Sequence, residues 1–224
     1  MRSADNSLEQ ALDPGRIIRH NSFMFRNRWR DYFENVIVAI FLALFVRTFI
    51  MTGYKVPSNA MSPILLPGDF IFSYRLPYGL KIPLTQIRLA GGEPKRSEII
   101  VFTFPDQPRV NFVKRVIGLP GDRIEIKNNE LFINEIKMNN SDSLKQGVDI
   151  VVKNFGPIVV PPNEVFVLGD NWNSNDDFRS WGTVPIDRIE GKVILIWLSL
   201  DWSSKEKGNI LPKLRSERIF STVD

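Results

Sequence analysis

A lysine lies in an apolar segment, NFVKRVIGLPGD, at residues 111–122. If this segment is a strand, alternation places Lys114 on one face with Phe112 and Val116, and places Arg115 on the other face. Apolar surroundings favour the neutral form of a lysine, which can then act as the general base for a hydroxyl nucleophile. The alternative is a lysine that extends to solvent, as strand lysines commonly do.

A lysine base matters here because the sequence lacks the cysteine and histidine residues that most other acid–base and metal sites require. The 224-residue chain has no cysteine and one histidine, His20, which lies in an arginine-rich leader. These counts exclude a disulfide framework, a thiol nucleophile, Cys-ligated metals, Ser-His-Asp triads and histidine-clustered metal sites. We therefore expect no metal site and no cofactor, and any acid–base chemistry must use Asp, Glu, Lys or Tyr.

A second candidate segment, PSNAMSP at residues 57–63, is stiff and turn-forming. On residue type alone, Ser58 in Pro-Ser-Asn is a turn-capping serine, and Met61 is a packing residue. Only its position relative to the lysine could give this segment a chemical role.

Both segments follow an apolar run near the N-terminus. VIVAIFLALFV at residues 36–46 contains no polar residue, and Tyr32–Ile50 has the length of about 20 residues that crosses a bilayer. Arg47 lies near one end, where it can reach the head groups. We expect a retained transmembrane helix at residues 32–54, because no signal-peptide cleavage site follows the run. A buried helix of a soluble protein is the alternative.

The net charge of +4 and the pI near 9.4 come from a local concentration of arginines. Five of them precede the apolar run: Arg16, Arg19, Arg26, Arg28 and Arg30. By the positive-inside rule, the leader at residues 1–31 is cytoplasmic and the rest of the chain lies outside. The cluster is explained by the membrane surface, so no nucleic-acid partner is expected.

Beyond the helix, the pattern changes to short strand-like runs, which predict a mostly β body at residues 55–202. Each run is rich in Val, Ile and Phe and is bounded by turn formers. This spacing favours a sheet or a barrel-like architecture. The runs are DFIFSY, EIIVFTF, VNFVKRVIGL, DRIEIKN, ELFINEI, DIVVKNF, EVFVLGD and GKVILIWL.

The connections between these runs carry turn signals. Asn128-Asn129 predicts a tight hairpin, and Asp122 and Asp170 are expected to hold turns. Residues 138–155 are more polar and loosely patterned, which predicts an inserted loop or small lobe. The polar C-terminal tail at residues 203–224 is expected to be mobile or lightly docked.

Four segments, in this order, resemble those of the bacterial type I signal peptidases, the membrane-bound Ser-Lys proteases that remove signal peptides from exported proteins. PSNAMSPILLPGDFI resembles the nucleophile segment, usually PSxSMxPTLxxGD, and RLPYGLKIPLT resembles the segment that follows. NFVKRVIGLPGD is similar to the lysine segment, and GDNWNSNDDFRSWGTVP to GDNRxNSxDSRxWGxVP. The resemblance runs from the apolar helix to about Trp197.

This resemblance implies a fold, a location and partners. The fold would be a signal-peptidase-like β body with a small inserted lobe, anchored by one transmembrane helix in the bacterial inner (cytoplasmic) membrane. The implied partners are preprotein signal peptides and membrane lipid, with the protein-export machinery as a further candidate.

The same resemblance assigns site residues. Lys114 takes the position of the general base, and the Ser58 hydroxyl and the main-chain N–H of Ala60 take the positions of the oxyanion hole. Met61 would line the substrate cleft. The last segment supplies site support: Asp177 and Arg179 match a salt bridge that braces the loop beside the lysine.

The chain departs from the family where the chemistry should be. Ala60 stands at the nucleophile position, where the family has serine, and a methyl group cannot attack a carbonyl. Ser62 is a poor substitute, because a misplacement of about 1 Å already costs on the order of 100-fold. Asn175 replaces a serine that hydrogen-bonds the lysine, although its side-chain oxygen can accept that bond. Further departures are Ile64, Trp172 and Phe178.

Two explanations account for Ala60. A deliberate Ser-to-Ala substitution would leave the other positions intact, whereas a degenerate paralogue would show several changes around the lost chemistry, and the additional departures favour the second. The prediction is a signal-peptidase-type serine endopeptidase that is inactive as written. The alternatives are a paralogue that binds signal peptides or a secretion partner without cleaving, and a membrane-tethered β domain with an unrelated structural role.

Overall fold

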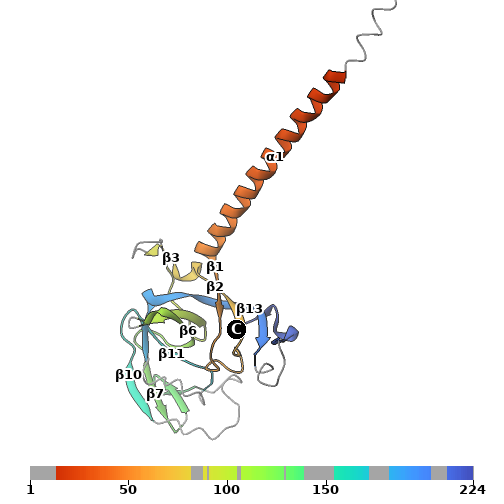
Figure 1. The fold of residues 1–224 in the computed structure, drawn as a ribbon. Helices are drawn as coiled ribbons and strands as arrows, with labels where there is room; N and C mark the ends of the chain where they lie inside the picture. Colours follow the sequence, from red (N-terminus) through yellow and green to blue (C-terminus); the bar gives the residue numbers. More distant parts are fainter. Residues whose placement is uncertain are drawn as a thin grey trace, which may run out of the picture. The chain divides into compact units, whose positions relative to one another are not determined.

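The computed structural model describes residues 14–81, 88–89, 91–104, 107–128, 130–138, 154–171, 182–202 and 211–223. The chain divides into two compact units, one within residues 1–47 and one within residues 48–224 (Figure 1). The first unit is helical, and the second is mostly β, as the sequence predicts.

The N-terminal unit is the helix α1, Pro14–Phe45, which continues into a π-helical turn, Val46–Ile50. Within it, Trp29–Ile50 has a mean hydropathy of 2.0 and buries none of its apolar side chains in the protein. By length and composition this segment can cross a membrane. The helix ends earlier than the predicted residue 54, because Met51–Lys55 pairs with the following strand as β1.

The body is built around one large antiparallel sheet. Its strand order is β1 (Met51–Lys55), β2 (Asp69–Tyr74), β13 (Ile189–Asp201), β5 (Ile99–Phe104), β6 (Gln107–Gly118), β11 (Glu164–Leu168) and β12 (Thr183–Pro185). Two short strands near the C-terminus, β14 (Lys213–Leu214) and β15 (Ser221–Thr222), also pair with β13. Within the described residues, the edge strands β1 and β12 do not pair with each other, so the sheet is open and is not a closed barrel.

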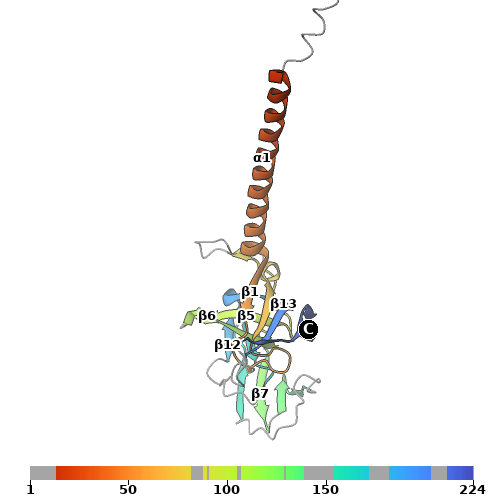
Figure 2. The ribbon, with the colours of Figure 1, turned by 45° about the vertical axis from the view of Figure 1, so that its right-hand side comes forward.

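A smaller antiparallel sheet lies at the end of the body away from β1 (Figure 2). Its order is β10 (Phe155–Val159), β7 (Arg123–Lys127), β8 (Glu130–Ile133) and β9 (Ile136–Lys137). The expected hairpin is confirmed, since Lys127 pairs with Glu130 and Asn128 has a φ of 50°. Residues 139–153 of the predicted lobe lie outside the described residues.

The remaining elements are β3 (Leu80–Lys81), β4 (Arg88–Leu89) and three single-turn 3₁₀ helices: Leu76–Tyr78, Ile186–Arg188 and Ser216–Arg218.

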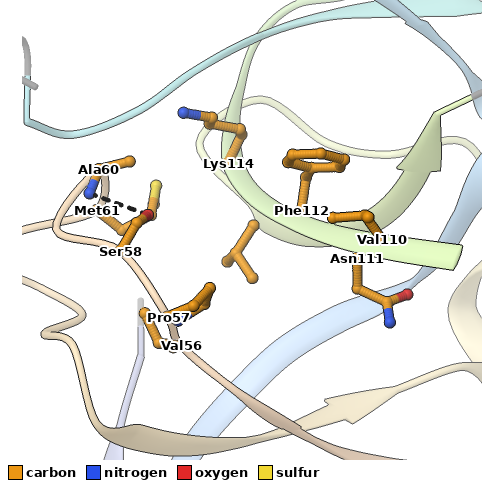
Figure 3. Close-up of a pocket in the computed structure, with 10 residues that line it drawn as sticks. Val56, Pro57, Ser58, Ala60, Met61, Val110, Asn111, Phe112 and Lys114 are labelled. Atoms are coloured by element: carbon orange, nitrogen blue, oxygen red, sulfur yellow. Dashed lines mark hydrogen bonds between the residues drawn. The ribbon is translucent and has the colours of Figure 1, made fainter. Parts of the chain in front are cut away.

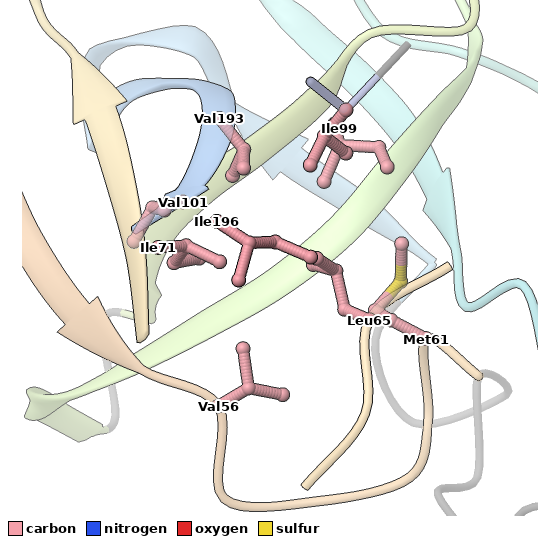
Figure 4. Packing of buried hydrophobic residues seen from close by; sticks show 9 residues of the cluster. Val56, Met61, Leu65, Ile71, Ile99, Val101, Val193 and Ile196 are labelled. Carbon is pink, nitrogen blue, oxygen red and sulfur yellow. The ribbon is translucent and has the colours of Figure 1, made fainter. Parts of the chain in front are cut away.

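One hydrophobic cluster joins the loop before β2 to the large sheet (Figure 4). Val56, Met61 and Leu65 of this loop pack against sheet residues that are themselves buried: Ile71, Ile99, Val101, Val193 and Ile196. Burial of each large apolar side chain contributes about 1.5–3 kcal/mol. The loop that contains Ser58 and Ala60 is therefore anchored in the core on both sides of these residues.

The C-terminal residues are part of this fold. Residues 211–223 form β14 and β15 against β13, and Val223 is only 4% exposed within the same hydrophobic cluster. The expectation of a mobile or lightly docked tail is therefore wrong for residues 211–223, because their partners lie far away in the sequence. Residues 203–210 and 224 lie outside the described residues.

Asp122 holds the turn between β6 and β7, as expected. Its carboxylate accepts hydrogen bonds from the Leu119 N–H at 2.6 Å, from Arg96 at 2.9 Å and from Asn134 at 2.9 Å. Burial alone raises the pKa of Asp122, but the bonds from Leu119, Asn134 and Arg96 outweigh it, so the pKa lies below its ordinary value. The contribution of Asp122 to stability is thus complete above the ordinary aspartate pKa of about 4 and is lost as the pH falls toward the lowered value.

We expect Asp122→Asn to lower the free energy of unfolding by about 1–3 kcal/mol at pH 7, because a charged acceptor of three hydrogen bonds is lost. The difference from the unsubstituted chain should shrink as the pH falls below about 4. Denaturant unfolding of the detergent-solubilised chain over this pH range measures both effects. The exposed Glu135→Gln in the same lobe serves as the control, and a difference independent of pH would contradict the assignment.

Candidate active site

The cleft loop, residues 56–69, connects β1 to β2 and has paired ends. The Val56 N–H donates to the Asp69 carbonyl at 2.8 Å, and the Gly68 N–H donates to the Val56 carbonyl at 3.0 Å. Gly68 has a φ of +91°, and a Cβ there would lie 2.0 Å from the Leu200 carbonyl oxygen, so only glycine fits. The loop therefore has a defined closure on β13.

A pocket of about 160 Å³ separates the cleft loop from β6 (Figure 3). The loop side presents Ser58, Ala60 and Met61, and the β6 side presents Phe112 and Lys114. The other lining residues are Val56, Pro57, Val110, Asn111 and Val113. The wall is mainly apolar, and one serine hydroxyl, one asparagine and one lysine supply its polar side-chain groups.

Lys114 is buried, with 6% of its surface exposed, because β6 is an interior strand of the sheet. It pairs with Ile100 of β5 on one side. Its neighbour Arg115, on the opposite face, is also buried. Alternation predicts at least one cation among apolar residues, and the structure buries both, because clusters of apolar side chains cover both faces of β6 here.

The Ser58 hydroxyl and the Ala60 main-chain N–H lie next to each other. The Ala60 N–H points to the Ser58 oxygen at 3.5 Å, a long and weak hydrogen bond (Figure 3). Two donors this close can both reach a single oxyanion. At position 60 itself the side chain is a methyl group, which offers neither a nucleophile nor a donor.

Gly169 brings the lysine and the cleft loop together. A Cβ at Gly169 would lie 3.4 Å from Lys114 Nζ and 2.5 Å from the Ala60 carbonyl oxygen. The next residues fasten the loop: the Asn171 N–H donates to the Ala60 carbonyl at 3.0 Å, and Asn171 Nδ2 donates to the Asn59 carbonyl at 3.0 Å. The peptide groups on both sides of the Ala60 Cα are thereby held.

A buried ion pair between Arg115 and Asp170 holds the segment that contains Gly169 and Asn171. Arg115 donates two hydrogen bonds to Asp170, from Nε at 2.8 Å and from Nη2 at 2.9 Å, and a third to the Ser97 carbonyl at 2.7 Å. Since β11 ends at Leu168 opposite Arg115, Asp170 follows directly beside the lysine strand. The side chain of Asp170 therefore joins two strands, whereas the sequence suggested only a turn.

The structure brings four of the predicted site residues together: Ser58, Ala60, Met61 and Lys114. The supporting residues Asn175, Asp177 and Arg179, and the departures Trp172 and Phe178, lie outside the described residues. Sequence analysis assigned no site role to Gly169, Asn171 or Arg115, although all three fall in the matched segments. No local signal marks them, because their function depends on contacts between segments.

The groups that line this pocket suit acyl transfer, the transfer of a carbonyl group to a nucleophile. Among the described residues, no group of three or more His, Cys, Asp or Glu side chains could hold a metal ion. A lysine amine facing two oxyanion donors suits attack on a peptide carbonyl by a hydroxyl at position 60. The residue at this position is alanine, whose methyl group supplies no hydroxyl.

Comparison with known proteins points to one family. The model of the family described as signal peptidase, peptidase S26, matches residues 29–198. Signal peptidase I of Buchnera aphidicola subsp. Baizongia pistaciae is 30% identical over 255 residues, covering 84% of this chain and 80% of the relative. Signal peptidase I of Pseudomonas aeruginosa is 27% identical over 216 residues, covering 80% and 75%. The crystal structure of a signal peptidase I from Enterococcus faecalis is 30% identical over 45% of this chain and 96% of that one, with a TM-score of 0.38.

Proposed function

The chain belongs to the signal peptidase family, peptidase S26, and from this premise we propose that its cleft binds the end of a preprotein signal peptide but does not cleave it. Cleavage of signal peptides is the activity of the family. In this sequence the positions of the general base, the oxyanion donors and the cleft keep the residues that the family uses, but alanine at position 60 cannot act as a nucleophile.

The observation that carries this proposal is the pocket between the cleft loop and β6. Lys114 faces the loop that contains Ser58 and Ala60, and Asn171 holds the Ala60 carbonyl. The pocket of about 160 Å³ has room for small side chains, such as those that end a signal peptide. The alternative, an active enzyme that uses Ser62 as its nucleophile, is less well supported, because Ser62 does not line the pocket.

A peptide that ends in small residues tests this proposal on the full chain in detergent. We expect the labelled peptide to bind and to remain intact in mass spectrometry, because loss of a nucleophilic serine costs on the order of 10⁶ in kcat. A control peptide with tryptophan at its −1 and −3 positions should bind at least about tenfold more weakly, since the small pocket excludes it. Clear cleavage that disappears with Ser62→Ala would contradict the proposal and make Ser62 the nucleophile.

For localisation, we propose a single-pass protein of the bacterial inner membrane with a cytoplasmic N-terminus. The arginine cluster at residues 16–30, on the N-terminal side of the apolar run at residues 36–46, supports this orientation. Signal peptides and membrane lipid are then the partners at the outer face, and the export machinery is a further candidate. The 1–31, 32–54, 55–202 and 203–224 division stays a proposal, with its helix boundary moved to the start of β1.

The orientation is testable by protease added to spheroplasts. We expect the C-terminal part of the body to be digested from outside, while an N-terminal epitope tag stays protected until the membrane is dissolved. A cytoplasmic marker protein controls for membrane integrity. Protection of the body together with digestion of the N-terminal tag would reverse the topology.

A further inference from the structure

Asp69, at the closure of the cleft loop, is a fully buried carboxylate held by the C-terminal segment, residues 211–223. Arg218 Nη2 lies 2.7 Å from its Oδ2, and Arg215 Nη1 lies 3.7 Å from its Oδ1. The Ser199 hydroxyl donates to Oδ1 at 2.5 Å. A buried carboxylate must be paired in this way, since an uncompensated charge in the interior is very costly.

The same two arginines also hold the main chain of the cleft loop. Arg218 Nη2 donates to the Ile64 carbonyl at 2.6 Å, and Arg215 Nη1 donates to the Pro67 carbonyl at 3.3 Å. Asp69 in turn accepts the Leu66 N–H at 2.8 Å. The second half of the loop, residues 64–69, is thus connected to the C-terminal segment by charged hydrogen bonds, which are stronger than neutral ones.

Val223, near the end of the segment, belongs to the same hydrophobic cluster as the loop. The Val223 N–H donates to the Ile194 carbonyl at 3.1 Å, and the Val223 side chain belongs to the hydrophobic cluster that contains Met61 and Leu65. Met61 lines the pocket. The C-terminal segment therefore contacts the loop at its polar closure and at its apolar base.

We propose that the C-terminal segment is a clamp that sets the position of the cleft loop, with Arg218 as a positioning residue for peptide binding. The loop has no strand pairing between its closed ends and only a few main-chain turn bonds, so side-chain contacts contribute much of what fixes its shape. Arg218 is not among the pocket-lining residues and acts through Ile64 and Asp69. This inference rests on the proposed function, because it takes the cleft loop as one wall of the peptide site.

The test compares amide hydrogen exchange and peptide affinity in the full detergent-solubilised chain. Arg218→Ala should raise exchange in residues 56–69 about tenfold or more, because bonds from a charged donor are lost, while residues 123–133 of the remote sheet stay unchanged. The affinity for the peptide with small terminal residues should fall about fivefold to tenfold. Glu217→Gln, exposed in the same turn, is the matched control and should change neither quantity.

Arg218→Lys should give an intermediate result, since it keeps the charge opposite Asp69 but lacks the second nitrogen of the guanidinium, Nε, which lies 3.4 Å from Asp69 Oδ1. It also serves the comparison if the alanine variant does not fold. Exchange in the loop that rises no more than in the control, or equally in residues 123–133, would overturn the clamp. Faster loop exchange with unchanged peptide affinity would overturn the role of Arg218 in binding. If the unsubstituted chain bound no peptide, the proposed function would fail, and loop exchange would still decide whether the segment holds the loop.

Discussion

Ala60→Ser is expected to restore cleavage after small residues, at a rate about 10³-fold or more above that of the unsubstituted chain. A serine nucleophile is worth on the order of 10⁶ in kcat, and Lys114 and Ser58 line the same pocket as position 60. We expect less than the full gain, because the family resemblance places Asn175 where a smaller serine would contact the lysine. Adding Asn175→Ser should therefore increase the rate further.

The control for this restored activity is Lys114. Lys114→Met keeps the length and apolar character of the side chain but removes the amine, so the double variant Ala60→Ser, Lys114→Met should return to background. The measurement is turnover of a preprotein in detergent, with both variants shown to bind the same peptide. If Ala60→Ser stays inactive even with Asn175→Ser, the site has decayed beyond one substitution, and the chain is a binding protein only.

Removal of the Asp170 carboxylate is expected to have the largest effect on stability. Asp170→Ala leaves the buried Arg115 guanidinium without its bidentate partner, and breaking such a pair costs about 3–5 kcal/mol. The ion pair of Lys127 and Glu125, in which the lysine is exposed, provides the control: Lys127→Ala should change the free energy of unfolding by no more than about 1 kcal/mol. Denaturant unfolding followed by tryptophan fluorescence measures both.

A second variant separates charge from packing. Replacing both members of the pair, with Arg115→Met and Asp170→Leu, should recover part of the lost stability, because no uncompensated charge remains. A loss of less than about 1 kcal/mol in Asp170→Ala would show that the pair contributes little, and the support of Gly169 and Asn171 would have to come from elsewhere.

The strands of the body were predictable because their signals are local. Val, Ile and Phe in short runs, bounded by Gly, Pro and Asn, mark β5, β7 and β11 within a few residues. The end of the helix was misplaced, because a second stretch rich in apolar residues, TFIMTGY at residues 48–54, follows Arg47. Only the pairing of Met51–Lys55 with β2 distinguishes strand from helix there.

The site was predictable as a set of segments but not as an arrangement. That Lys114 and Ala60 face each other across a pocket could be predicted only from the family resemblance, since 54 positions separate the two and no periodicity relates them. The bonds of Arg115 to Asp170 and of Arg218 to Asp69 join residues 55 and 149 positions apart. Long-range ion pairs of this kind leave no pattern in a single sequence, which is why the docked C-terminal residues were expected to be loose.

The separation between Asp69 and Arg218 also has a consequence for the order of folding. A chain is synthesised and exported from its N-terminus, and contacts between distant residues form late. Asp69, Met61 and Leu65 are therefore made long before the arginines and the valine that complete their surroundings. If the body lies outside, as proposed, we expect the wall of the cleft to reach its final form only after residues 211–223 have crossed the membrane, so a nascent chain stalled before Leu211 would present an open, unfinished cleft loop.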